Sequence, residues 1–138
     1  ETQPVMLRLQ SDLVDLLDAA IDGQLHATEA QWDPRPSLGV VMAAKPYPEA
    51  PITGDVISGL DTVPGTAKVF HAGTALDADG RVVSAGGRVL CVAALGESVS
   101  DAQRNAYAGV DAVSWANEFH RNDIGLRAIA REQSERGG

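Results

Sequence analysis

The sequence contains a single cysteine, few aromatic residues, fewer basic than acidic residues, and no long apolar segment. One thiol, at Cys91, cannot close an internal disulfide or form a cysteine-based zinc site, so a reducing cytoplasm is the simplest compartment. Eleven Lys and Arg residues against nineteen Asp and Glu residues give a formal net charge of −8 at pH 7. An acidic chain repels phosphate backbones and anionic lipid surfaces, so we expect no nucleic-acid partner and no membrane partner.

The longest apolar runs, residues 38–44 and 89–95, have seven residues each, whereas a membrane-spanning helix needs about twenty. No basic segment followed by an apolar stretch opens the sequence, which argues against a signal peptide. The first residue is Glu1 rather than Met, so we expect a chain that was processed, trimmed or cut from something longer. The 138 residues suit one domain with a real core, or one domain plus part of another.

Helical periodicity occurs in three places: residues 11–22, 98–113 and 123–133. The first helix has an apolar face of Leu, Ala and Ile residues and a wet face of Asp residues, with Gly23 as a plausible stop. The second begins with the spacing of a capping box, from Ser98 to Asp101. Residues 1–10 show no clean period.

Strands are expected at residues 38–44, 67–76, 81–85 and 88–95. An Asp-Gly turn and a Gly-Gly pair separate the last three, which is the sequence form of an antiparallel meander. Trp32 and Trp115 are expected to close the rim of the core. The expected fold class is therefore α+β, an antiparallel β-sheet with helices packed against it.

Taken alone, the residues show no complete active site. The three histidines, His26, His71 and His120, are far apart and have no partners at metal-ligand spacing, so we interpret them as surface or structural residues. Cys91 lies in the middle of an apolar strand, where a thiol behaves as a small hydrophobic side chain.

The triplet Gly86-Gly87-Arg88, between two expected strands, is more suggestive. Paired glycines let the backbone approach a ligand and direct N–H groups at an anion, and an arginine adds a charged fork suited to phosphate. The competing interpretation is a β-bulge or tight turn with a surface arginine, and from the triplet alone it is the better one. Lys68, His71 and Thr74 on the preceding strand lie within reach of the same sheet edge.

Several longer segments occur together in one order and spacing: residues 1–17, WDPR (32–35), 39–44, 54–60, AKVFHAGT (67–74), GGRVLCVAALG (86–96) and 123–133. With them the chain resembles the C-terminal part of phosphoribosylamine–glycine ligase, also called glycinamide ribonucleotide synthetase, of the ATP-grasp superfamily. The resemblance covers nearly the whole chain. One departure is residues 45–49, Lys-Pro-Tyr-Pro-Glu, where the family commonly has glycines before Tyr-Pro.

The resemblance implies an ATP-dependent ligase of purine biosynthesis. ATP phosphorylates the carboxylate of glycine, the amine of 5-phosphoribosylamine attacks the acyl phosphate, and glycinamide ribonucleotide, ADP and phosphate result. The cofactors implied are ATP and Mg²⁺ or Mn²⁺. The nucleotide module and metal-binding residues of the family precede Glu1. We therefore expect residues 1–34 to be the end of the ATP-grasp module, residues 35–138 to be the C-terminal substrate-closing domain, and the chain by itself to be inactive.

The resemblance also assigns candidate site residues, with no catalytic or metal-ligating residue among them. By position, Gly86, Gly87 and Arg88 match a loop of related enzymes that closes over the substrate and binds ribose phosphate, which now favours phosphate binding. Thr2, Gln3 and Arg8 follow the metal motif of the family and are candidates to line the pocket for glycine or phosphoribosylamine. The competing interpretation is that Arg8 simply packs on neighbouring elements.

Two functional hypotheses follow. The chain is either a ligase fragment that acts only with its N-terminal module, or a non-catalytic binding or assembly domain that keeps the fold. The partners of the first hypothesis are glycine, 5-phosphoribosylamine, ATP and the N-terminal module of the same protein.

Overall fold

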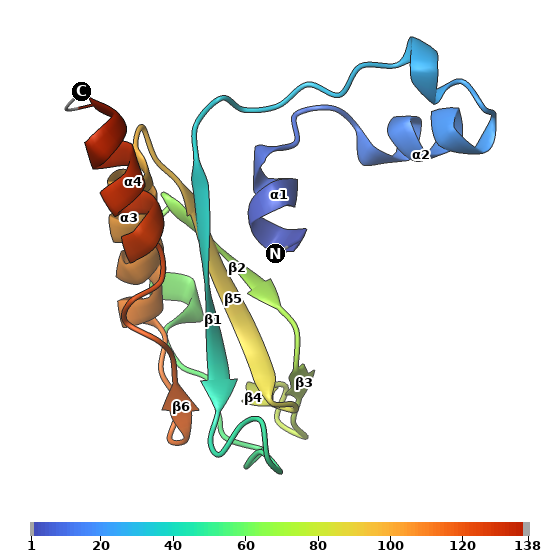
Figure 1. Cartoon of the computed structure of the whole chain (residues 1–138). Helices are drawn as coiled ribbons and strands as arrows, with labels where there is room; N and C mark the ends of the chain where they lie inside the picture. The colour runs from blue at the N-terminus through green and yellow to red at the C-terminus, as the bar shows by residue number, and fades with distance from the viewer. Residues whose placement is uncertain (1, 137–138) are drawn as a thin grey trace.

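The computed structural model describes residues 2–136 and consists of one antiparallel sheet, a separate hairpin and flanking helices (Figure 1). The elements in chain order are α1 (Thr2–Arg8), α2 (Leu13–Ile21), the 3-10 helix η1 (Leu25–Ala27), β1 (Ser37–Ala44), the 3-10 helix η2 (Leu60–Thr62), β2 (Ala67–His71), β3 (Thr74–Leu76), β4 (Val82–Ser84), β5 (Arg88–Leu95), α3 (Val99–Ala112), β6 (Glu118–Phe119) and α4 (Leu126–Arg136). The predicted α+β class is confirmed.

The four-stranded sheet has the order β2-β5-β1-β6, and all its pairs are antiparallel. Its two long strands are rich in Val, Ala and Leu and are largely buried, as the sequence predicts. Ser37 pairs with Leu95 at one end, and Ala43 pairs with Arg88 at the other, after a register shift between Met42 and Ala43. Arg88 therefore lies at the end of the sheet where β1 finishes.

The predicted meander is wrong in its pairing. The segment expected as one strand at residues 67–76 is broken, and β2 pairs directly with β5 while β3 and β4 form their own hairpin. Gly73 lies at the break, and a Cβ on it would come within 2.9 Å of the Gly86 Cα. Because Gly73 and Gly86 lack side chains, the backbones just before β3 and just after β4 can pack closely together. The β3–β4 hairpin leaves the main sheet at this point.

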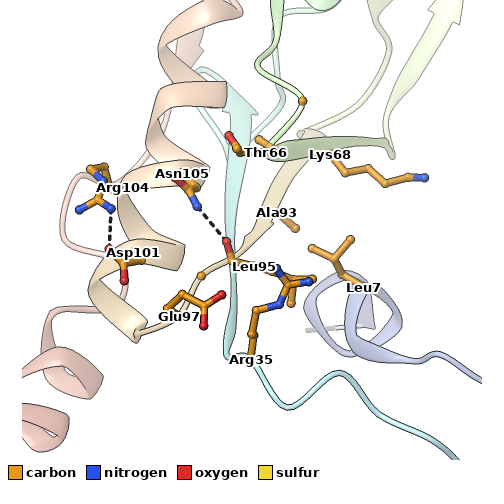
Figure 2. Close-up of a pocket in the computed structure, with 13 residues that line it drawn as sticks. Leu7, Arg35, Thr66, Lys68, Ala93, Leu95, Glu97, Asp101, Arg104 and Asn105 are labelled. Atoms are coloured by element: carbon orange, nitrogen blue, oxygen red, sulfur yellow. Dashed lines mark hydrogen bonds and ion pairs between the residues drawn. The ribbon is translucent and has the colours of Figure 1, made fainter.

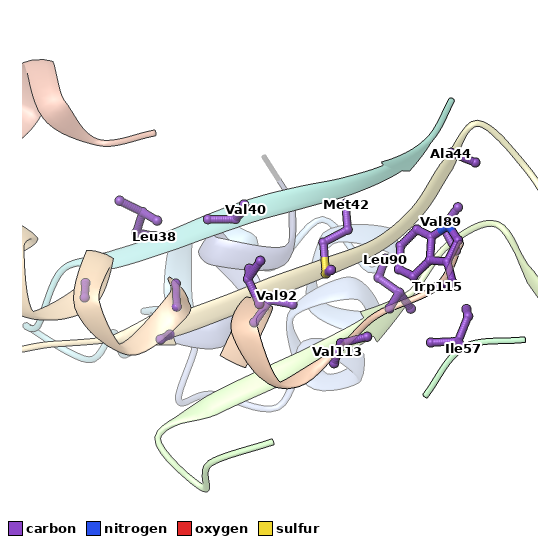
Figure 3. Close-up of a cluster of buried hydrophobic side chains, with 14 residues drawn as sticks. Leu38, Val40, Met42, Ala44, Ile57, Val89, Leu90, Val92, Val113 and Trp115 are labelled. Carbon is purple, nitrogen blue, oxygen red and sulfur yellow. The ribbon is translucent and has the colours of Figure 1, made fainter. Parts of the chain in front are cut away.

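The core lies between the sheet and α3. Its members are Leu38, Val40, Met42, Ala44, Ile57, Val89, Leu90, Val92, Ala94, Ala102, Ala106, Val110, Val113 and Trp115, most of them labelled in Figure 3. Helix α3 begins as predicted, because the Ser98 hydroxyl accepts from the Asp101 amide at 3.1 Å. Trp115 is 8% exposed and closes the core, whereas Trp32 is 45% exposed and does not, so that part of the expectation is wrong.

Helix α1 covers the opposite face of the sheet and was not predicted from the sequence. Pro4 lies against Gly39, where an added Cβ would be 2.8 Å from the proline Cγ. Side chains alternate along a strand, so Gly39 faces α1 while Val40 faces α3. Cys91 is also on the α1 side, is 4% exposed, and has its pKa raised by burial. The predicted burial of this thiol is confirmed.

Residues 9–36 form an arm that leaves the end of α1, carries α2 and η1, and returns to the start of β1 (Figure 1). Helix α2 has the predicted two faces, but its apolar face is uncovered in the described residues: Leu17 is 53% and Ile21 is 82% exposed. Its N-cap is Asp12, and the hydroxyl of the preceding Ser11 accepts from the Gln31 amide across the arm. Within residues 2–136, no helix is both long and apolar enough to cross a membrane.

Candidate functional site

The triplet Gly86-Gly87-Arg88 connects the β3–β4 hairpin to β5, and its carbonyls are tied to two neighbouring segments. The Gly87 carbonyl accepts from the Ala44 amide at 2.9 Å, and the Arg88 carbonyl accepts from the Gly73 amide at 3.0 Å. By contrast, the Gly86 and Gly87 amides donate to no protein acceptor within the described part of the chain. The turn is therefore anchored through its carbonyls and leaves two N–H groups unused.

Close packing explains the two glycines, because neither has a positive φ. A Cβ on Gly86 would lie 3.2 Å from the Gly73 Cα, and one on Gly87 would lie 2.4 Å from Cδ2 of Tyr47. The space above Gly87 is thus filled by the ring of Tyr47. The missing side chains of the two glycines thus make room for other parts of the same protein, while their amides have no protein acceptor within the described residues.

Arg88 is the first residue of β5, and its side chain is exposed. Within residues 2–136 its guanidinium has no hydrogen bond and no ion pair. Other arginines differ, since Arg35, Arg81 and Arg121 each form an ion pair with a nearby aspartate. The guanidinium and the two unused amides are all hydrogen-bond donors, so an anion can accept hydrogen bonds from them.

Lys68, His71 and Thr74 were expected near this edge, but the strand pairing places them at two different ends of the sheet. His71 pairs with Leu90, and its Nδ1 lies 3.0 Å from the Thr74 hydroxyl, so both residues lie near Arg88. Lys68 pairs with Ala93, toward the opposite end of β5. Only His71 and Thr74 therefore remain associated with the Arg88 turn.

The N-terminal candidates all lie on α1, and the structure separates Arg8 from the Arg88 turn. The Arg8 Nε donates to the Asp33 carbonyl at 3.0 Å, and the Asp33 amide donates back to the Arg8 carbonyl at 2.7 Å. This contact lies beside the start of β1, and at roughly 3.3 Å per residue the two ends of β5 are about 23 Å apart. Thr2 is exposed and Gln3 is half-buried at the other end of α1.

Asp33 joins the returning part of the arm to the end of α1, which is a role that sequence reasoning missed. Both of its carboxylate oxygens accept from the Arg35 guanidinium, at 3.0 and 2.7 Å. The hydrogen bond from Arg35 holds the pKa of Asp33 at about 2. The Asp-Pro-Arg sequence offered a signal, because a carboxylate two residues before an arginine forms such a fork readily.

A cavity of about 760 Å³ lies at the Arg35 end of the sheet, away from Arg88 (Figure 2). It is lined by Leu7, Arg35, Gly65, Thr66, Ala67, Lys68, Ala93, Leu95, Gly96, Glu97, Asp101, Arg104 and Asn105. Much of its polar lining is already paired. Arg104 bonds to Asp101, Asn105 donates to the Leu95 carbonyl, and Arg35 binds Asp33.

Together these features define an α+β domain with a glycine turn and an exposed arginine at one end of its sheet and an arm at the other. The family model described as "Phosphoribosylglycinamide synthetase, C domain" matches residues 37–127. The chain belongs to this family.

Named relatives agree with this assignment. The chain is 76% identical over 133 residues to a phosphoribosylamine–glycine ligase of Xanthomonas campestris, a match covering 96% of this chain and 31% of that protein. It is 60% identical to the ligase of Pseudomonas putida, over 98% of this chain and 31% of that protein. A solved structure of the ligase from Thermotoga maritima matches with a TM-score of 0.62 and 31% identity, covering 78% of this chain and 27% of that one. The chain thus spans about a third of the length of the relatives it matches.

Proposed function

We propose that this chain is the C-terminal part of a cytoplasmic phosphoribosylamine–glycine ligase. The complete protein joins glycine to 5-phosphoribosylamine with ATP, giving glycinamide ribonucleotide, ADP and phosphate. Support comes from the family match and from the 76% identity to a protein of that name over nearly the whole chain. Since the chain spans only a third of that relative, the reaction is assigned to the complete protein rather than to these residues.

Arg88 is the residue of this chain that binds the 5-phosphate of phosphoribosylamine. The observation that carries the proposal is its exposed guanidinium, unpartnered within residues 2–136, beside two backbone amides that have no acceptor. A phosphate oxygen bound there accepts charge-assisted hydrogen bonds from a planar fork and from the amides of Gly86 and Gly87. Thr2 and Gln3 are the further candidates for lining the substrate pocket.

ATP and its metal ion, Mg²⁺ or Mn²⁺, would supply phosphoryl transfer to glycine. The residues present here do not fit a metal site, because no group of three or more His, Cys, Asp or Glu side chains in residues 2–136 could hold an ion. We therefore derive no step of phosphoryl transfer from this chain. We assign the nucleotide and the metal to the N-terminal two thirds of the protein.

The arm belongs with that N-terminal module, and we place the boundary between residues 1–34 and residues 35–138. The apolar side of α2 supports this placement, since Leu13, Leu17 and Ile21 are between 42% and 82% exposed. A stripe of large apolar side chains on a helix normally packs against another element. The family model also starts at residue 37, after the arm.

Steady-state kinetics of the complete ligase test the role of Arg88. Losing one charge-assisted hydrogen bond to phosphate costs about 1.5–3 kcal/mol, so Arg88→Ala should raise the KM for phosphoribosylamine about ten- to a hundredfold. The KM for ATP should stay unchanged, and Arg88→Lys should recover only part of the loss because a point charge lacks the planar fork. Arg131→Ala, at an exposed arginine of α4, is the matched control. If folded Arg88→Ala enzyme keeps the wild-type KM for phosphoribosylamine, the proposal is refuted and Arg88 is a surface arginine of a tight turn.

A further inference from the structure

Tyr47 lies on the residue that precedes Arg88. One edge of its ring covers Gly87 so closely that a Cβ there would be 2.4 Å from Cδ2 and 3.0 Å from Cε2. The tyrosine remains 38% exposed, and within the described residues its hydroxyl has no hydrogen-bond partner. The side chain is therefore only partly buried, and one edge of its ring packs against the backbone of this turn.

The loop that carries Tyr47 is fixed at both of its ends. The Tyr47 amide donates to the Ala44 carbonyl at 3.0 Å, and the Ile52 amide donates to the Lys45 carbonyl at 2.8 Å. The Lys45 amide in turn donates to the carbonyl of Asn117, beside β6, at 2.8 Å. The tyrosine thus projects from a loop braced against two strands.

A side-chain network supports the same end of the sheet. Asp55 Oδ2 accepts from both the backbone amide and the Nδ2 of Asn117, at 3.0 and 2.8 Å. The Asp55 amide donates to the hydroxyl of Ser84, a residue that is only 1% exposed. Because Asn117 also accepts from Lys45, this network connects the base of the Tyr47 loop to β4, the strand just before the glycine pair.

Gly87 is therefore held from two sides. The Ala44 amide donates a hydrogen bond to the Gly87 carbonyl. The Tyr47 ring blocks the space into which the Gly87 Cα could otherwise move. Glycine has the widest conformational freedom of any residue, and two successive glycines before Arg88 would leave the arginine poorly directed without such a constraint. Ordering this turn before the ligand arrives reduces the entropy lost on binding.

We propose that Tyr47 is a positioning residue for Arg88, acting on phosphoribosylamine binding only by fixing the Gly86-Gly87 turn. This inference rests on the proposed function, in which Arg88 binds the substrate phosphate. The ring, rather than the hydroxyl, does the positioning, since the atoms nearest to a Cβ on Gly87 are the ring carbons Cδ2, Cε2 and Cγ.

The test uses the complete ligase with Tyr47→Ala, Tyr47→Phe, Arg88→Ala and the double variant Tyr47→Ala/Arg88→Ala, varying each substrate in turn. Tyr47→Ala should raise the KM for phosphoribosylamine about three- to thirtyfold, because a misdirected binding group loses its geometry, and kcat and the KM for ATP should change less than about twofold. Tyr47→Phe should retain the wild-type KM. In the double variant, removing Tyr47 should add less than about twofold to the effect of Arg88→Ala, because the tyrosine acts through the arginine.

Leu76→Ala removes a 69% exposed apolar side chain from the neighbouring β3 and serves as the control, with no expected change. Tyr47→Leu replaces Tyr47→Ala if the latter does not fold, with the same expected direction. An unchanged KM in the Tyr47 variant alongside a raised KM in Arg88→Ala overturns the positioning role and leaves the proposed function intact. Additive effects in the double variant also overturn it. An unchanged KM in Arg88→Ala overturns the proposed phosphate contact itself, and the positioning role with it.

Discussion

Gly109 is buried on the side of α3 that faces the sheet, and replacing it with alanine sets two effects against each other. Alanine favours the helix by about 1 kcal/mol relative to glycine. The added Cβ, however, would lie 2.7 Å from Cγ1 of Val92 and 2.8 Å from the Cβ of Ala67. Carbon atoms in van der Waals contact are about 3.5–4.0 Å apart, so both contacts are roughly 1 Å too short.

The two neighbours of Gly109 cannot easily give way. Val92 is 0% exposed within the core cluster (Figure 3), and the Cβ of Ala67 has no rotamer to change. Helix α3 must therefore shift away from the sheet, and overpacking of this kind costs about 1–3 kcal/mol. Two rigid contacts place the cost in the upper part of that range, so we expect Gly109→Ala to lower the free energy of unfolding by about 1–2 kcal/mol net of the helix gain.

Urea unfolding of this chain, followed by circular dichroism, measures the effect. With a slope of about 2 kcal/mol/M, in the middle of the usual range, the midpoint should fall by about 0.5–1 M at unchanged slope. Ala108→Gly, at an exposed position of the same helix, reports the helix-propensity contribution alone and should cost about 1 kcal/mol. If Gly109→Ala instead stabilises the chain by the amount that Ala108→Gly removes, the close packing of α3 on Val92 and Ala67 is refuted.

Three further outcomes are expected. The carboxylate form of Asp33 stabilises the base of the arm, because its pKa falls from the ordinary 3.8 to about 2; this contribution is present above pH 3.8 and is lost as the pH falls toward 2. Hydrogen-exchange protection of the Gln10 and Asp33 amides should decline over that window, and unaltered protection there would exclude the linkage. Cys91 should react with a thiol reagent far more slowly in the native chain than in urea, since burial raises its pKa; equal rates would contradict its burial. The chain alone should show no glycine-dependent ADP production, and mixing it with the N-terminal part of the ligase should restore it; turnover by the chain alone, or no turnover from the mixture, would count against the proposed function.

Local chemistry made some features readable from the sequence by itself. The bounds of β5 and the capping of α3 by Ser98 follow from neighbouring residues, because strand periodicity and a hydrogen bond spanning three positions require no distant partner. The α+β class followed from the same local signals. Arg88 stood out because a glycine pair precedes it.

Tertiary structure decided the features that join residues far apart in the chain. The ring of Tyr47 fills the space beside the Gly87 Cα, and the Gly86 backbone packs against Gly73, so the protein itself fills the space where side chains would lie. Within the described residues, the amides of both glycines still have no protein acceptor. The close packing of Gly73 and Gly86 turns one expected strand into β2 and β3, which belong to different sheets. Sequence periodicity identifies which face of α2 is apolar, but only the fold shows that no described residue covers it, because burial depends on which segments meet in space rather than on their spacing along the chain.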